Sequence, residues 1–73
     1  MKHAGLLLVV ALGFILGIQD GYIALWKDGS AKPVEIFPFQ AQLLPEKDQD
    51  ALEKGIRIES ADQLAQLMED YLS

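Results

Sequence analysis

The sequence predicts an α+β protein in which one amino-terminal transmembrane helix precedes a small ββαβα domain, a three-stranded sheet packed by two helices on one face. Two observations support this fold class. Residues 4–18 form an unbroken run of apolar or small side chains. From residue 20 onward, apolar residues recur first with the two-residue period of strands and finally with the period of a helix. We therefore expect a membrane anchor or signal segment over residues 1–19 and an extracytoplasmic domain over residues 20–73.

The apolar run follows a positive charge at Lys2 and precedes the polar residues Gln19 and Asp20. This order is typical of a signal or anchor segment, and it places the amino terminus in the cytoplasm. The fifteen residues of the run would rise about 22 Å as a helix, which is short for a hydrocarbon core of roughly 30 Å. We expect an uncleaved anchor in the cell membrane. A cleaved signal peptide is the alternative, because its core has a similar length.

Two glycines in the run, Gly13 and Gly17, stand four residues apart. In a helix they would share one face and let a second helix approach closely, which would allow a homodimer through the membrane helix. The alternative is that these glycines only reflect the composition of membrane helices.

The first half of the domain predicts two strands joined by a turn. Residues 21–27 alternate in the manner of a strand, and residues 34–37 form the returning strand. Between them, Asp28-Gly29 is a strong hairpin dipeptide. The residues expected on one face of the first strand are Tyr22, Ala24 and Trp26.

The second half predicts a helix, a short strand and a longer helix. Residues 45–54 begin with proline and acidic side chains and end at Gly55, a residue suited to a helix carboxyl end. Residues 56–59 alternate apolar and charged side chains, as in a third strand. Ser60 and Gln63 have the spacing of a capping box at the start of the last helix. Its apolar stripe consists of Leu64, Leu67, Met68, Tyr71 and Leu72.

The charge of the predicted domain excludes some classes of partner. From Asp20 onward there are eleven acidic and five basic residues, a difference of −6. Such a domain repels phosphate backbones, so we expect no nucleic-acid binding. The acids are interspersed with apolar residues, which distinguishes the segment from a disordered acidic tail.

Two residue types that commonly serve nucleophilic catalysis, cysteine and histidine, are missing from the predicted domain. The chain has no cysteine, and its one histidine, His3, precedes the membrane run. A Ser-His or Cys-His pair therefore cannot form within the domain. The acidic cluster at Glu46, Asp48, Asp50 and Glu53 lacks the spacing of a calcium loop and suits a helix start. We expect no catalytic residue, no cofactor and no metal.

Trp26 is the candidate contact with a partner. It ends a predicted strand beside a turn, where a partly exposed tryptophan can anchor a bound protein. Burial in the core or placement at the membrane interface is the alternative.

Several of these residues together resemble the carboxy-terminal domain of BofC, the bypass-of-forespore regulator of sporulating bacteria. The resemblance covers roughly residues 17–73 and rests on turn, cap and core positions. They are Gly17-Ile18 and Asp20-Gly21 before the first strand, Asp28-Gly29, Leu44-Pro45-Glu46, Leu52, Gly55-Ile56 and Ser60 with the helix to Tyr71.

The resemblance implies a small α+β domain with a regulatory role outside the cytoplasm, since BofC restrains the protease that relays the sigma-K checkpoint signal. BofC carries an additional amino-terminal domain, whereas here the apolar run joins the domain directly. No catalytic residue follows from the family. We expect a membrane-anchored, non-enzymatic interaction or regulatory module connected with sporulation, which binds another extracytoplasmic or membrane protein. A secreted or structural module released by signal cleavage is the alternative, and a small enzyme ranks below both.

Overall fold

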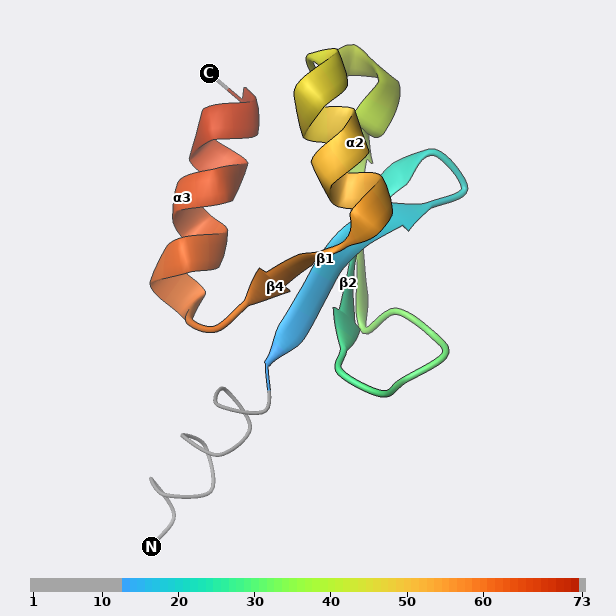
Figure 1. Ribbon diagram of the computed structural model, residues 1–73, viewed down its shortest axis with the longest axis vertical. Coiled ribbons are helices and arrows are strands. Elements are labelled where there is room, and N and C mark those ends of the chain that lie inside the picture. The colour runs from blue at the N-terminus through green and yellow to red at the C-terminus, as the bar shows by residue number, and fades with distance from the viewer. Residues whose placement is uncertain (1–12, 73) are drawn as a thin grey trace, which may run out of the picture.

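The computed structural model describes residues 13–72, which form a four-stranded sheet, two α-helices and one 3₁₀ turn (Figure 1). The strand order is β3-β2-β1-β4, and all three neighbouring pairs are antiparallel. The elements are β1 Phe14–Gln19, β2 Tyr22–Lys27, β3 Glu35–Gln40, η1 Ala41–Leu43, α2 Glu46–Lys54, β4 Ile56–Ile58 and α3 Ala61–Leu72.

β1 corrects the prediction that the apolar run is a membrane helix through residue 18. Phe14–Gln19 is a strand in an interior position of the sheet, paired with β2 on one side and β4 on the other. An apolar run can be a strand as well as a helix, because an interior strand whose residues are buried or half-buried needs few polar side chains. The sheet therefore has four strands instead of three, and the domain includes residues that we assigned to the segment 1–19.

The rest of the expected membrane segment, residues 1–12 with Lys2 and His3, lies outside the described residues. Within residues 13–72, neither helix is both long enough and apolar enough to cross a membrane.

The turn between β1 and β2 explains why these strands pair. Asp20 and Gly21 are its two central residues, with φ angles of 52° and 88°. Two successive positive φ angles match the right-handed twist of a tight hairpin, and Asp-Gly favours this conformation. The predicted turn at Asp28-Gly29 is also present, and there the amide of Ser30 donates to the carbonyl of Lys27 at 2.9 Å. The connection to β3 continues beyond this turn to residue 34.

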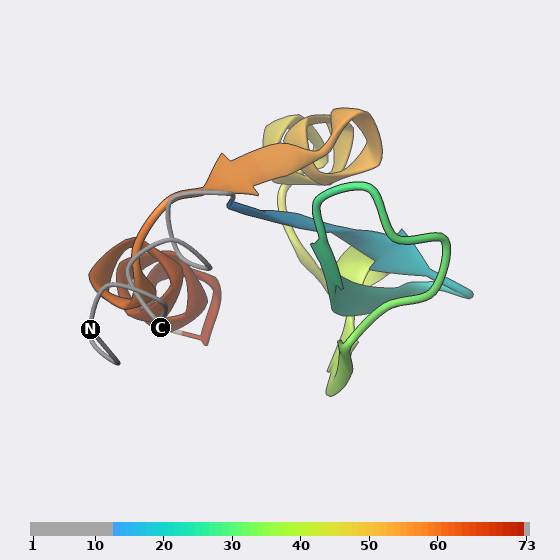
Figure 2. The ribbon, with the colours of Figure 1, turned by 90° about the horizontal axis from the view of Figure 1, so that it is seen from below.

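The core lies on one face of the sheet, beneath α3 (Figure 2). Ile23 of β2 and Leu16 of β1 are buried in this core. Leu52 enters the same core from α2, which runs alongside β1 near the end that β4 does not reach (Figure 1). The predicted stripe of α3 packs against these residues through Leu64, Leu67, Met68 and Tyr71.

The predicted capping residues join α3 to the edge of the sheet. The hydroxyl of Ser60 accepts a hydrogen bond from the amide of Gln63 at 3.1 Å, as a capping box requires. The Gln63 side chain reaches further back than expected. Its Oε1 accepts from the amide of Glu59 at 2.8 Å, and its Nε2 donates to the carbonyl of Arg57 at 2.8 Å. The Gln63 carboxamide thus satisfies one backbone donor and one backbone acceptor at the carboxyl end of β4. Because β4 is an edge strand, these backbone groups would otherwise be open to another chain.

Candidate interaction surfaces

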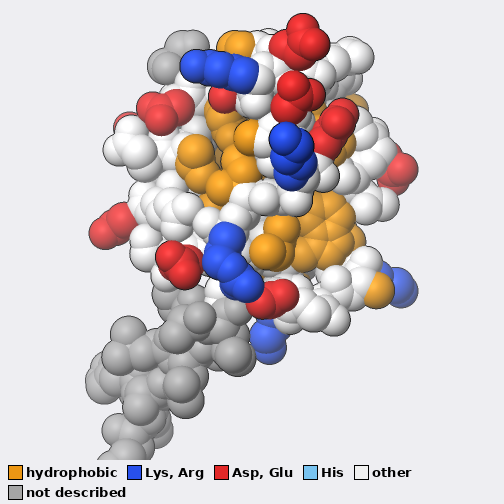
Figure 3. Space-filling model, in the orientation of Figure 1, with side chains coloured by type: hydrophobic (Ala, Val, Ile, Leu, Met, Phe, Trp, Pro, Cys, Tyr) orange, Lys and Arg blue, Asp and Glu red, His pale blue; other side chains and the backbone are white. Residues whose placement is uncertain are grey.

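The exposed large hydrophobic residues of the described chain fall into two places instead of being scattered. Ile36 and Val34 lie on or just before β3, at exposed fractions of 53% and 56%. Tyr22, Leu43 and Leu72 border a groove at another part of the molecule. In Figure 3, hydrophobic side chains gather between the charged ones on the viewed side. Grouped apolar groups on a surface mark interaction sites more often than isolated ones do.

The first place is the open face, by which we mean the sheet face opposite α3. Its residues are Ile15, Gly17, Ala24, Trp26 and Ile36. Ile15 is paired with Trp26, Gly17 with Ala24, and Ala24 with Ile36, so these side chains occupy one face across three strands. Neither helix crosses the centre of this face (Figure 2). Only the carboxyl end of α2 approaches its β1 margin, where Gly55 lies against Ile15.

Trp26, the predicted partner contact, is half-buried on the open face because its ring lies over Gly17. A β-carbon at Gly17 would lie 3.1 Å from Cζ3 of Trp26 and 3.3 Å from the carbonyl oxygen of Leu52. Both approaches are tighter than ordinary van der Waals contact, so this close fit requires glycine. Trp26 is therefore fixed in place from below and keeps its outer surface accessible.

The predicted helix-packing pair, Gly13 and Gly17, does not lie on a helix. Gly17 is in β1, and Gly13 precedes that strand with a φ of +83°. A β-carbon at Gly13 would lie 2.9 Å from Nη1 of Arg57. Both glycines make close contacts within the domain. A homodimer of the chain stays a prediction.

A charged pair borders the open face beside Ile15. Arg57 is the β4 residue paired with Ile15, and its Nη2 lies 3.2 Å from Oδ2 of Asp28. Both side chains are about half exposed, at 53% and 45%. A pair in such contact with water contributes about 0–1 kcal/mol to stability. It gives the open face a polar rim.

The second place is the end groove, which lies between the end of β3, the η1 turn and the last turn of α3. It has a volume of about 420 Å³. It is lined by Tyr22, Ile23, Pro38, Phe39, Gln40, Leu43, Leu44, Tyr71 and Leu72. Burial raises the pKa of the Tyr71 phenol above its usual value, and the negative charges of Asp48 and Asp70 raise that pKa further.

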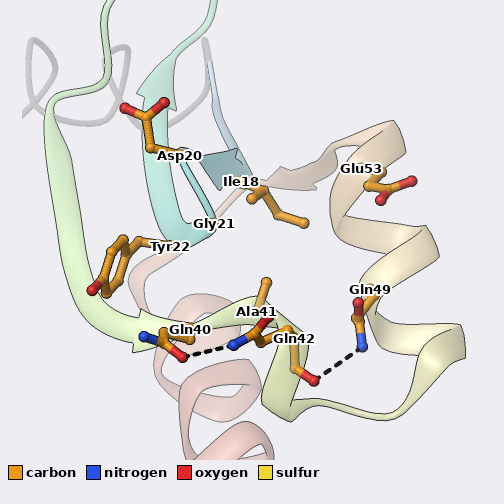
Figure 4. A pocket seen from close by; sticks show the side chains of 9 residues that line it. All are labelled: Ile18, Asp20, Gly21, Tyr22, Gln40, Ala41, Gln42, Gln49 and Glu53. Carbon is orange, nitrogen blue, oxygen red and sulfur yellow. Dashed lines mark hydrogen bonds between the residues drawn. The ribbon is translucent and has the colours of Figure 1, made fainter.

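A third, polar cavity of about 330 Å³ lies beside the β1–β2 turn (Figure 4). Its amide side chains bind one another or the backbone: Nε2 of Gln42 donates to Oε1 of Gln40 at 3.0 Å, and Nε2 of Gln49 donates to the Leu44 carbonyl at 2.8 Å. The carboxylates of Asp20 and Glu53 point away from each other in Figure 4. They are not placed as an acid–base pair across the cavity.

The acidic residues of the described chain do not converge on a metal site. Within residues 13–72, no group of three histidine, cysteine or carboxylate side chains is placed to hold a metal ion. Two of the acidic residues of α2, Glu46 and Asp48, stand in its first turn. Their placement suits the positive end of the helix dipole.

The fold and its surfaces define a small α+β domain with apolar patches suited to protein contacts. The family model of the BofC C-terminal domain matches residues 12–73, and the chain belongs to this family. No curated protein and no solved structure matches the chain. The match begins before Phe14, in agreement with β1 as part of the domain. Membership of this family suggests a sporulation-related regulatory module.

Proposed function

We propose that this chain is a non-enzymatic protein-interaction module of a sporulation-related regulator, and that the open face binds its partner. The observation that carries the proposal is the position of Trp26. Its ring is held over Gly17, next to Ile15 and near exposed Ile36, on a face that α2 touches only at Gly17 and Ile15. Tryptophan is enriched among the residues that contribute most to binding at protein interfaces.

The rim of the open face supports a partner of mixed polarity. The Arg57–Asp28 pair lies beside Ile15 and remains accessible. Protein interfaces combine an apolar centre with a polar border of this kind. The open face has this composition.

The non-enzymatic part of the proposal rests on the residue types of the chain. Nucleophilic catalysis with a cysteine or with a histidine base would need residues that the sequence does not supply beyond His3. The carboxylates at the polar cavity, Asp20 and Glu53, point apart. We accordingly rank the interaction module above a passive structural module and above a small enzyme, with no cofactor required.

The interaction is tested by affinity purification of the full chain from its own host in mild detergent. Ile36→Glu places a charge in the open face at an exposed position, so the fold is retained while contact is lost. Asp50→Asn on α2 is the matched surface control. We expect a protein that co-purifies with the parent and with the control and is lost from the Ile36→Glu sample. A protein retained equally by all three would rule out the open face as its binding site.

We also propose that the domain is held at the membrane, outside the cytoplasm, with its amino terminus inside. The support is the order in the sequence of Lys2, the apolar residues 4–12 and the acidic domain. Ser30 is exposed in the β2–β3 connection, and the chain has no other cysteine that could compete with Ser30→Cys. We expect an impermeant maleimide to label this variant in intact, non-sporulating cells. Labelling only after lysis would contradict export.

A further inference from the structure

The polar cavity beside the β1–β2 turn shares no lining residue with the open face, and the proposed function makes no use of it. Its volume of about 330 Å³ lies at the lower end of the range of ligand pockets. Figure 4 shows Tyr22 of β2 on one side and Gln49 of α2 on the other, with Ile18 of β1 between them. The cavity therefore has room for one small molecule.

Three glutamine side chains of the cavity are held in place by hydrogen bonds. Nε2 of Gln42 donates to Oε1 of Gln40 at 3.0 Å. Nε2 of Gln49 donates to the carbonyl of Leu44 at 2.8 Å and to that of Gln42 at 3.4 Å. Within residues 13–72, Oε1 of Gln42, Oε1 of Gln49 and Nε2 of Gln40 make no hydrogen bond. Each amide is thus fixed through one atom and free at the other, which lowers the cost of ordering it around a ligand.

The two carboxylates of the cavity restrict the charge of that ligand. Asp20 and Glu53 are part of the lining, which contains neither lysine nor arginine. They would repel a phosphate or a carboxylate. Because they point away from each other in Figure 4, they are not placed to enclose a cation together. These two observations favour a neutral ligand.

The free polar atoms of the cavity include both acceptors and donors. Oε1 of Gln42 and of Gln49 can accept, and Nε2 of Gln40 can donate. A hydroxyl group matches such a mixture, because it can donate to one atom and accept from another. Tyr22, which is 38% exposed, and Ile18 add apolar surface to the same cavity. This surface suits the C–H side of a ring whose edge carries hydroxyl groups.

We propose that the polar cavity binds a neutral sugar, with one ring between Tyr22 and Gln49. The hydroxyl groups donate to Oε1 of Gln42 and of Gln49 and accept from Nε2 of Gln40. The C–H side of the ring lies against Tyr22. This site is additional to the open face, so the domain can hold a glycan and a protein at the same time.

The test is saturation-transfer difference NMR on the full chain in phosphatidylcholine nanodiscs, with empty nanodiscs as the blank. The probes are glucose, mannose and N-acetylglucosamine, and we expect a saturable signal from at least one of them. The 6-phosphate of the bound sugar should bind more weakly, because Asp20 and Glu53 line the cavity. Cyclohexanol has a similar ring but only one hydroxyl group, so it should bind at least about fivefold more weakly.

Gln42→Ala removes one free acceptor and the support of Gln40, so it should weaken binding of the sugar about fivefold. Gln42 is exposed, so the fold is retained, which circular dichroism checks. Gln66→Ala is the matched control, since Gln66 is an exposed glutamine of α3 whose side chain donates to Asp70; it should leave the affinity unchanged. The proposal is overturned if none of the three sugars gives a saturable signal. Equal affinity for cyclohexanol and the sugar would also overturn it, as would equal affinity of the two variants for the sugar.

Discussion

Gln63 connects the start of α3 to the edge strand β4, and we expect Gln63→Ala to lower the free energy of unfolding by about 1 kcal/mol. The side chain makes two hydrogen bonds of 2.8 Å, to the Glu59 amide and the Arg57 carbonyl. A neutral hydrogen bond contributes about 0.5–1.5 kcal/mol. Both bonds are exposed, so water replaces them in part and each contributes about 0.75 kcal/mol, in the lower half of that range. Alanine regains about 0.5 kcal/mol through its helix propensity.

The assay is urea unfolding of the full chain in neutral detergent, followed by the fluorescence of Trp26, the one tryptophan of the chain. For a domain of this size, 1 kcal/mol corresponds to a fall in Tm of about 4–8 °C. Gln66→Ala is the matched control, because Gln66 is in the same helix and binds only the exposed carboxylate of Asp70 at 3.2 Å. The reasoning is refuted if Gln63→Ala is no more destabilising than Gln66→Ala. Loss of Gln63 should also promote self-association through the freed edge.

Three further predictions concern the core, the open face and the end groove. Leu52→Ala should lower the free energy of unfolding in urea by about 2–5 kcal/mol, since Leu52 is 1% exposed. Leu43→Ala, the exposed control, should lower it by less than about 0.5 kcal/mol. Equal losses in the two variants would contradict the assignment of Leu52 to the core. Gly17→Ala should displace the ring of Trp26 and shift its emission to longer wavelength, and an unchanged spectrum would contradict the contact. The pKa of Tyr71 is raised in the folded domain. The protonated phenol therefore contributes its full stability below about pH 10, the ordinary pKa of tyrosine in the unfolded chain. This contribution is lost as pH rises through the pKa of the folded state. Urea unfolding should show a smaller alkaline loss in Tyr71→Phe, and an equal loss would contradict this.

The carboxy-terminal part of the fold could be predicted from local patterns. The helix that ends at Gly55 is present, and Gly55 has the positive φ of 91° that such an end favours. The strand after it and the helix that begins after Ser60 are also confirmed. These elements carry their own signals in the form of turn residues, caps and alternation, which act over a few residues.

The position of β1 could not be predicted in the same way, because its residues are apolar on both faces. Leu16 enters the core, and Ile15 belongs to the open face, so no polar alternation distinguishes the strand from a membrane run. The available signal was Asp20-Gly21, a two-residue hairpin turn directly before the strand that we did predict. Recognising it would have paired β1 with β2.

The same misassignment of β1 explains why only part of the candidate site was predicted. Trp26 was predicted as a partner contact, and the structure places it half-buried on the open face, while its contact with a partner remains a prediction. Ile15 and Gly17 were missed as its neighbours because both were assigned to the membrane segment. Ile36 was predicted only as part of a strand. Its exposure depends on which face the helices leave uncovered, and that is decided by contacts between distant segments.

The sheet order also determines when this domain becomes complete as the chain is synthesised. β1 leaves the ribosome first but occupies an interior position, and its second neighbour, β4, is made only after α2. Contacts between distant segments form slowly because a long loop must close. A nascent or truncated chain that stops before Ile56 therefore presents the unpaired side of an apolar strand, and such edges recruit other chains. Premature termination before β4 should therefore yield a fragment that aggregates and does not form a functional domain.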